Sequence, residues 1–333
     1  MNSDRRSVLT AGLALSAFGA GRAYAQTPLP TADGLLPPGL PQPTEIIDLW
    51  PAGAPGYPAN PPVEKTTERS TDALVNDRAV LGITVPRMAV FRPDRPNGAA
   101  VLLIPGGGYK HVVVDKEGYE MARWLTARGF TAFVLFYRLP YDGWAAGPDV
   151  CLSDAQRSMR LIRHRWAQFA IDPERVAVMG FSAGGHLCAD LGTRFAAVTY
   201  DKTDDADELG AKPFCAAPAY PVISMATEAA HPGSREKLLG AAPLPALVAA
   251  HSPDQNVPED APPFFILHAE DDDVVPVENA LLLRAALKAK GIPVETHLFQ
   301  HGGHGFGLRK AVGKSVAVWP ELWRSWARSI GFA

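Results

Sequence analysis

The sequence is poor in cysteine and has no excess of positive charge. Only three of its 333 residues are cysteine, Cys151, Cys188 and Cys215, and each lies in an apolar run. We therefore expect buried free thiols rather than a disulfide framework. Lysine and arginine total 32 against 35 acidic residues, for a net charge of −3. That balance provides no basic surface for nucleic acid or for an anionic membrane, and we expect neither as a partner.

Long apolar runs and internal repeats are also missing. The apolar run over 8–20 is too short to span a bilayer comfortably. It follows Arg5-Arg6 and precedes Ala23-Tyr24-Ala25, which fits an A-x-A cleavage site. We predict an export signal over 1–25 and a mature protein in the periplasm or outside the cell. The arginine pair resembles a twin-arginine signal, but the usual phenylalanine after it is missing, so ordinary secretion stays open.

Prolines are concentrated directly after this signal. Eleven of them lie between residues 28 and 62, which excludes continuous helix and central strand there. We predict that the proline-rich segment over 26–63 is extended, with Trp50 and Tyr57 packing back against the body of the protein. A single catalytic domain is expected over 64–333.

Buried strands alternate with helices through this domain. Short apolar runs predict strands over 98–104, 131–136, 175–181, 213–219 and 264–269, and a last strand is predicted over 294–299. Helices are predicted over 117–128, 150–169, from 183, over 277–290 and near the C-terminus. The alternation indicates an α/β fold, a mostly parallel sheet with helices on both faces. In the helix over 150–169 we expect Arg163 on a solvated face and a core stripe of Ala155, Met159, Ile162, Trp166 and Phe169.

A nucleophile elbow lies between a predicted strand and a predicted helix. The string Gly180-Phe-Ser-Ala-Gly184 matches G-x-S-x-G, a sharp turn that exposes the serine hydroxyl. Side chains at positions 180 and 184 would clash in such a turn. The N–H of Ala183 then lies at a helix N-terminus, where it can bind a developing oxyanion. We predict Ser182 as the nucleophile.

A serine hydroxyl needs a base and an acid that orients the base. His301 and His304 lie in a glycine-rich loop after the last strand, and the glycines between them prevent the helix that a zinc site would require. We expect no metal and no other cofactor. For the acid, Asp272 is favoured by its place before a Val-Val-Pro turn, with Asp273 and then Asp271 as alternatives. The order serine, aspartate, histidine is that of the α/β-hydrolases.

A glycine run follows the first buried strand. Pro105-Gly-Gly-Gly108 lacks both the G-x-G-x-x-G spacing and the Walker lysine, so phosphate binding is not indicated. At this place an α/β-hydrolase supplies the second N–H of its oxyanion hole. We assign that role to Gly107 or Gly108, alongside Ala183.

Several strings together resemble the carbohydrate-esterase branch of the α/β-hydrolases, which includes acetylxylan esterases and feruloyl-esterase-like proteins. They are Ile104-Pro-Gly-Gly-Gly-Tyr109, Asp115-Lys-Glu-Gly118, Tyr137-Arg-Leu-Pro140, Met179-Gly-Phe-Ser-Ala-Gly-Gly-His186, Asp271-Asp-Asp-Val-Val-Pro276 and Gly302-Gly-His-Gly-Phe306. The resemblance runs from about residue 45 to the C-terminus. It implies His304 as the base, with His301 behind it, and a cofactor-free serine esterase acting through an acyl-enzyme on acetylated xylan-type oligosaccharides.

The segment between the strands near 219 and 264 is short and broken by prolines, which predicts a small cap and a pocket for short acyl groups. Tyr109, Tyr141 and Trp144 lie on loops expected near the site, where aromatic faces suit stacking against sugar rings. Two other functions remain open. A serine peptidase of the prolyl-oligopeptidase type would need a propeller-sized N-terminal domain, and a catalytically silent hydrolase-fold binding protein would not need the complete serine, histidine and aspartate set.

Overall fold

The computed structural model describes residues 41–72, 74–226 and 228–333. The predicted export signal over 1–25 and the first part of the proline-rich segment lie outside the described residues. In the described part of the chain, no helix combines the length and the apolarity needed to cross a membrane.

Eight strands form the main sheet, in the order β1-β4-β7-β5-β8-β9-β10-β11. β4 alone runs against the others, and the remaining neighbours from β7 to β11 pair in parallel. This is the mostly parallel sheet predicted from the alternation of strands and helices. The strands are β1 (Glu45–Asp48), β4 (Arg87–Phe91), β5 (Ala100–Ile104), β7 (Thr131–Phe136), β8 (Val176–Phe181), β9 (Ala216–Ala219), β10 (Phe264–Ala269) and β11 (Val294–Phe299).

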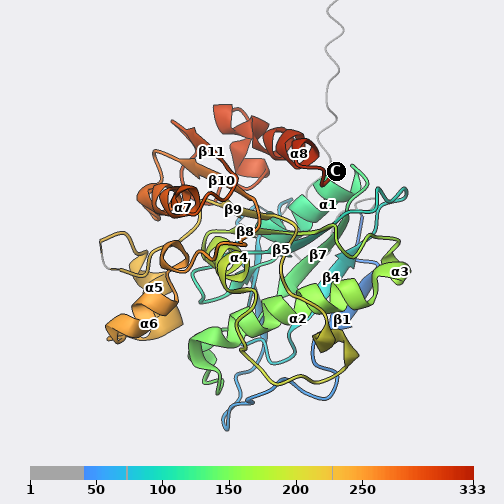
Figure 1. Cartoon of the computed structure of the whole chain (residues 1–333), viewed down its shortest axis with the longest axis vertical. Coiled ribbons are helices and arrows are strands. Elements are labelled where there is room, and N and C mark those ends of the chain that lie inside the picture. Colours follow the sequence, from blue (N-terminus) through green and yellow to red (C-terminus); the bar gives the residue numbers. More distant parts are fainter. Residues whose placement is uncertain (1–40, 73, 227) are drawn as a thin grey trace, which may run out of the picture.

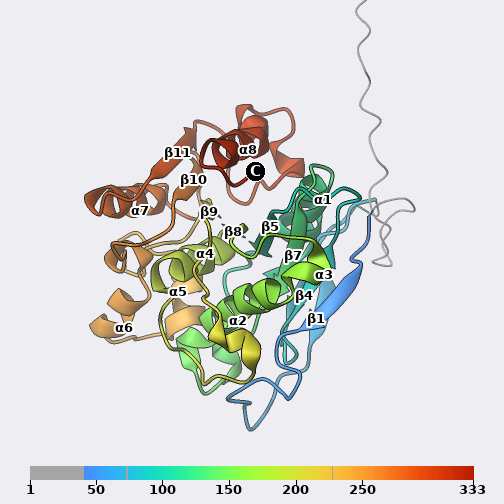
Figure 2. The ribbon, with the colours of Figure 1, turned by 45° about the vertical axis from the view of Figure 1, so that its right-hand side comes forward.

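Helices cover both faces of this sheet (Figures 1 and 2). On one face α1 (Glu120–Thr126) lies beside α8 (Trp319–Ser329), with the rings of Trp124 and Trp323 6.4 Å apart. On the other face α2 (Val150–His164) packs against α4 (Ala183–Arg194). α7 (Glu278–Ala289) contacts β10 and β11. Because strands β5, β7, β8 and β10 are buried along their whole length, both faces need this cover.

A small antiparallel ribbon lies beside the main sheet. It consists of β2 (Lys65–Glu68), β3 (Arg78–Leu81) and β6 (Val112–Val113). Asp115 fixes it, because the carboxylate accepts hydrogen bonds from the backbone N–H and the guanidinium of Arg78, each at 2.7 Å at its shortest. β6 begins four residues after the last glycine of the glycine run, so the ribbon is held next to the region expected to form the oxyanion hole.

The cap between β9 and β10 is small, as the short and proline-broken sequence predicted. Its helices are α5 (Pro232–Leu239) and α6 (Pro245–Ala250), each of which begins at a proline. Neither is long enough to enclose a deep acyl tunnel.

The predicted helix over 150–169 is wrong in its last five residues. It breaks at Arg165, and a short α3 (Trp166–Phe169) follows. Trp166 is therefore 50 % exposed instead of lying in the core. Arg163, expected in solvent, is buried because its guanidinium donates to three loop carbonyls, those of Pro173, Gly210 and Lys212.

The proline-rich segment is in part structured. It contributes β1, an edge strand, which the prolines around it permit although the sequence analysis did not predict it. Trp50 packs back as expected: its ring is buried and its Nε1 donates to Asp154 Oδ1 at 2.8 Å. Tyr57 stays 55 % exposed while its ring edge contacts Trp144. The three cysteines are free and buried, as predicted.

Candidate active site

Ser182 occupies a strained turn between β8 and α4. Its φ is 55° and its ψ is −120°, which is rare for a residue with a side chain. The two flanking glycines make this turn possible. A Cβ at Gly180 would lie 2.1 Å from the carbonyl oxygen of Gly184, and one at Gly184 would lie 2.2 Å from that of Ile104. The clash expected from the motif is therefore present on both sides of the turn.

The predicted nucleophile, base and acid lie within hydrogen-bond distance of one another. Ser182 Oγ is 2.9 Å from His304 Nε2, and His304 Nδ1 is 2.8 Å from Asp272 Oδ2. The Asp272 side chain has no exposed surface. Burial alone would raise the pKa of this carboxyl, but hydrogen bonds from His268 and His304 hold the pKa well below its usual range. Asp272 is therefore an ionised acceptor that can fix His304 with its proton on Nδ1 and its free lone pair toward Ser182.

The carboxylates of the neighbouring Asp271 and Asp273 do not contact His304. Asp271 accepts the N–H groups of Gly302 and Gly303, both at 2.7 Å, and thereby holds the loop that carries His304. Its Oδ2 lies 3.4 Å from Nδ1 of His301, whose side chain is 67 % exposed. Asp273 is exposed, and within the described ranges no hydrogen bond or ion pair involves its carboxylate. Of the three candidate acids, the structure brings only Asp272 to His304.

The glycine run lies against the nucleophile elbow. Gly107 has φ 133° and Gly108 has φ 64°, and a Cβ at Gly107 would lie 2.0 Å from the carbonyl oxygen of His111. The N–H of Gly106 is already bound to Glu117, at 2.8 Å. Ala183 is the first residue of α4, so its N–H has no acceptor within the helix. The predicted oxyanion donors Gly107, Gly108 and Ala183 thus lie in the region around Ser182.

Glu117 is a site residue to which the sequence analysis gave no role. It is 3 % exposed, and its second oxygen accepts the hydroxyl of Tyr220 at 3.1 Å. That hydroxyl accepts the N–H of Gly307 at 3.2 Å, and the Tyr220 ring lies against His304. One carboxylate thus connects the glycine run to the loop that carries the base. The string Asp115-Lys-Glu-Gly118 belonged to the family resemblance, but only the π-helical turn over Asp115–Tyr119 shows where its glutamate lies.

A cavity of about 340 Å³ opens at the reactive side chains. Ser182, His304, Gly107 and Gly108 line it, together with residues from the ribbon region and from α5. A cavity of this volume suits a small acyl group and part of its alcohol.

None of the three aromatic residues predicted to contact a sugar lines this cavity, and two of them are buried. Tyr109 has no exposed surface, and its hydroxyl is 2.6 Å from His186 Nδ1. Trp144 is 3 % exposed and packs on the Arg138 guanidinium, 4.8 Å from its ring centroid. Those two predictions are wrong, because the loops fold their rings inward. Tyr141 is 41 % exposed and donates its hydroxyl to the Lys110 carbonyl oxygen.

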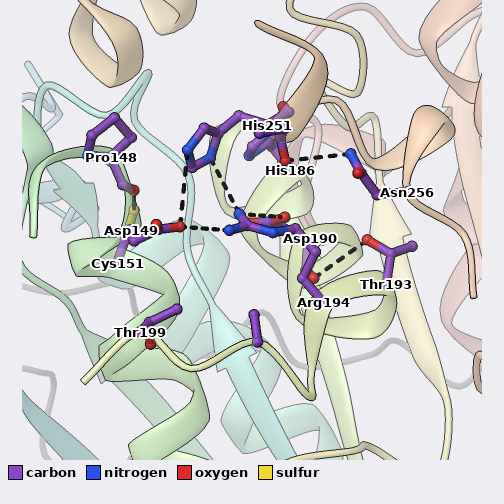
Figure 3. Close-up of polar contacts among 12 residues, drawn as sticks. Pro148, Asp149, Cys151, His186, Asp190, Thr193, Arg194, Thr199, His251 and Asn256 are labelled. Carbon is purple, nitrogen blue, oxygen red and sulfur yellow. Dashed lines mark hydrogen bonds and ion pairs between the residues drawn. The ribbon is translucent and has the colours of Figure 1, made fainter. Parts of the chain in front are cut away.

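The buried ring of Tyr109 ends at a polar network behind α4. Burial lowers the pKa of His186 to about 4, so the imidazole is neutral and its Nε2 donates to the His251 carbonyl oxygen at 2.8 Å. Figure 3 shows the His251 ring beside Asp149 and Arg194, whose guanidinium lies 2.8 Å from that carboxylate. The glycine run is thereby connected to the helix that carries the nucleophile.

Comparison with known proteins identifies a family and several relatives. The BD-FAE family model matches residues 88–287. The crystal structure of an acetyl ester-xyloside bifunctional hydrolase from Caldicellulosiruptor lactoaceticus is 38% identical, with a TM-score of 0.74, over 88% of this chain and 99% of that one.

Two curated relatives are larger proteins. The acetylxylan esterase of Xylanibacter ruminicola is 32% identical over 67% of this chain and 44% of its own length. The endo-1,4-beta-xylanase B of Butyrivibrio fibrisolvens is 35% identical over 69% of this chain and 36% of its own length. The chain thus spans less than half the length of these two relatives. The family match, the solved relative and the strand order lead to one conclusion: the chain belongs to the BD-FAE family of α/β-hydrolases.

Proposed function

We propose that this chain is a serine carboxylic-ester hydrolase that works through an acyl-enzyme and removes acetyl groups from xylan-type oligosaccharides. The observation that carries the proposal is the Ser182–His304–Asp272 hydrogen-bond chain, with its two distances of 2.9 and 2.8 Å, opening into a small cavity. The similarity to an acetylxylan esterase and to an acetyl ester-xyloside hydrolase supports the choice of substrate.

In the first half of the reaction, Ser182 Oγ attacks the ester carbonyl carbon while His304 Nε2 takes its proton. The resulting imidazolium is stabilised by the ionised Asp272. The carbonyl oxygen becomes an oxyanion that accepts N–H groups from Ala183 and the glycine run. Each such donor is worth roughly 3 kcal/mol of barrier in comparable sites.

The second half repeats this chemistry with water. Collapse of the tetrahedral intermediate breaks the bond to the alcohol, which leaves with the proton held on His304. A water molecule then gives a proton to His304 and attacks the acyl carbon. The second collapse returns the proton to Ser182 Oγ and releases the acid.

The preference for a short acyl group follows from the small cap. α5 and α6 have 8 and 6 residues, and α5 supplies part of the cavity wall. A longer acyl chain does not fit in the cavity beside its alcohol. It therefore gains nothing from burial of its methylene groups and displaces its carbonyl carbon from Ser182 Oγ, which lowers kcat/KM.

We propose in addition that the protein is exported. The proposal is supported by the arginine pair, the apolar run and the A-x-A string over 1–25. Replacement of Arg5-Arg6 by Lys-Lys should leave unprocessed precursor in the cytoplasm if the twin-arginine route is used. Unimpaired export of that variant would assign the protein to the general pathway.

The test of the activity is acetate release from acetylated xylo-oligosaccharides, with Ser182→Ala as the inactive control. With p-nitrophenyl esters of increasing chain length, kcat/KM should fall at least ~10-fold from acetyl to octanoyl, about 1.4 kcal/mol. Equal turnover of octanoyl esters would reject the short-acyl pocket. Labelling of Ser182 by a fluorophosphonate separates an enzyme from a silent binding protein, and cleavage of peptides without ester turnover would favour the peptidase.

A further inference from the structure

The cavity at Ser182 has a charge opposite to that of the whole chain. The negative charges on its wall belong to Glu117 and Glu236. Burial lowers the pKa of His111 and of His231, which also line it, and so favours their neutral forms. With those histidines neutral, the lining side chains carry a net charge of +2, against −3 for the chain. Four cationic side chains line the cavity: Arg69, Lys110, Lys116 and Lys237.

Two of these four cations are compensated by nearby carboxylates. Arg69 is 2.7 Å from Asp77, and Lys116 is 3.6 Å from Glu117. For Lys110 and Lys237, the described part of the chain offers no carboxylate within 4.0 Å of the ammonium group. Asp142 lies near Lys237 beyond ion-pair distance: burial raises the pKa of this carboxyl to about 6, and the Lys237 charge opposes the rise. Lys110 and Lys237 are therefore the two lining cations without a direct ion pair, and we expect them to meet a charge on a ligand.

Tyr141 brings the two lysines to the same side of the cavity. Its hydroxyl donates to the carbonyl oxygen of Lys110 at 2.8 Å, which ties it to the loop after β5. Lys237, on α5, has its Nζ 4.5 Å from the centroid of the Tyr141 ring, a cation–π distance. Lys110, in a loop next to the oxyanion donors, and Lys237, on the cap helix α5, thus bring positive charge to the two sides of the exposed Tyr141 ring.

We propose that Lys110 and Lys237 select esters whose alcohol part carries a carboxylate, as an acetylated oligosaccharide with a uronic acid residue does. This inference rests on the proposed function. An acetyl group has no room for a charge of its own, so the anion must belong to the alcohol. Cations that line a cleft raise the local concentration of an anionic substrate, and salt weakens this effect.

The first experiment compares 4-acetoxybenzoate with its methyl ester, each enzymatic kcat/KM divided by the rate of hydroxide hydrolysis to remove the difference in leaving group. At 10 mM salt the charged ester should be preferred about tenfold, which corresponds to two exposed ion pairs of ordinary strength. Salt at ~300 mM should remove most of that preference, because screening then acts within about 6 Å. A preference that is absent at low salt overturns the proposal.

The second experiment assigns the preference to the two lysines. Lys110→Gln and Lys237→Gln should each lower the charged-over-neutral ratio about two- to fivefold, the range for an exposed ion pair. Lys290→Gln, at an exposed lysine after α7 that does not line the cavity, should leave the ratio unchanged. Melting temperatures check that each variant is folded. A ratio that both cavity variants leave at the wild-type value overturns the assignment.

A third comparison locates the charge. Phenyl hemisuccinate carries its carboxylate on the acyl part, and phenyl methyl succinate is its neutral partner. A preference for the hemisuccinate equal to that for 4-acetoxybenzoate would overturn the placement on the alcohol. On natural material, acetate should be released faster from acetylated xylo-oligosaccharides that contain a uronic acid than from those without one. Failure to hydrolyse even the neutral acetyl esters would reject the proposed function, whereas neutral turnover without a charge preference would reject only this inference.

Discussion

Two cavities lie at opposite ends of the same parallel strands. The one at the carboxyl ends, around Ser182, has a volume of about 340 Å³, whereas the one at the amino ends of β8, β9 and β10 has about 900 Å³. Pro173, Phe214 and Pro263, which precede those strands, line the larger cavity together with Trp166. Volume alone would direct attention to the wrong end of the sheet.

The smaller cavity differs in its backbone and in its hydrogen bonds. Of the four described non-glycine residues with positive φ, Tyr109, Ser182 and Tyr220 belong to the loops that carry the site. At the larger cavity, by contrast, each of the three nitrogens of the Arg163 guanidinium donates to a loop carbonyl. Strain together with donors that have no partner indicates a functional site better than size does, because a fold keeps costly conformations only where the surrounding structure imposes them.

The largest expected effect tests this contrast directly. Ser182→Ala should lower kcat by ~10⁴- to 10⁶-fold, since the nucleophile is lost while the oxyanion donors remain. Trp166→Ala, in the larger cavity and half exposed, should leave kcat within about twofold, as surface substitutions usually do. Steady-state kinetics on p-nitrophenyl acetate provide the measurement. If Ser182→Ala keeps a tenth of the wild-type rate, the cavity at the carboxyl ends of the strands is not the catalytic site.

The next effect separates the three aspartates of one loop. Asp272→Asn should cost ~10³- to 10⁴-fold in kcat, because an amide facing His304 Nδ1 stabilises the wrong tautomer. Asp271→Asn should cost less than about tenfold, since its carbonyl oxygen can still accept the N–H groups of Gly302 and Gly303. Asp273→Asn should be silent. A larger loss at Asp273 than at Asp272 would contradict the geometry.

A smaller effect is expected at Glu117. Glu117→Ala leaves the buried N–H of Gly106 without an acceptor, which costs about 1–3 kcal/mol of stability. It also frees the glycine run, so kcat should fall ~10- to 100-fold with little change in KM. Glu117→Gln retains an acceptor for Gly106 and should restore most of the rate. Equal loss in both variants would show that a side chain of the same shape with one acceptor oxygen is not enough at this position. An unchanged kcat in Glu117→Ala would refute the positioning role.

Local signals were enough to predict the central strands and the nucleophile. The predicted bounds 131–136, 264–269 and 294–299 coincide with β7, β10 and β11, because strands of a parallel sheet carry recognisable short runs flanked by turns. Ser182 was found from a strand, a turn and a helix that are contiguous in the chain. The strands β1, β2, β3, β4 and β6 were missed, since each has at most five residues. β1 and β2 are also edge strands and partly exposed, which leaves no clear period.

Features that depend on distant segments could not be predicted. The role of Glu117 depends on its hydrogen bonds with Gly106 and Tyr220, and Tyr220 lies 103 residues further along the chain. Tyr109 is an aromatic residue in a loop near the site, as a sugar-stacking residue would be. Only the contact with His186 shows that its ring is buried. The choice of Asp272 over its neighbours depended on a turn motif, and the register was then visible only in the distances to His304.

The smallest effect concerns stability and compares one histidine from each region. His186 is 1 % exposed, and burial lowers its pKa to about 4, below the value of 6.5 for a free imidazole. Between these two values the unfolded chain binds a proton that the folded protein does not. Stability from this group is therefore present above pH 6.5 and is lost as the pH falls toward 4.

From pH 7 to pH 5.5 this single group should lower the free energy of unfolding by about 1 kcal/mol, the cost of its proton uptake in the unfolded state. His186→Gln keeps an acceptor for Tyr109 and a donor for the His251 carbonyl but cannot titrate, so its stability should fall by that much less over the same interval. His164→Gln, an exposed histidine at the larger cavity, should follow the wild-type curve. Urea unfolding at both pH values measures the difference. Parallel curves for wild type and His186→Gln would mean that His186 is protonated in the folded protein, and that the contact between the glycine run and α4 is not the neutral hydrogen bond described above.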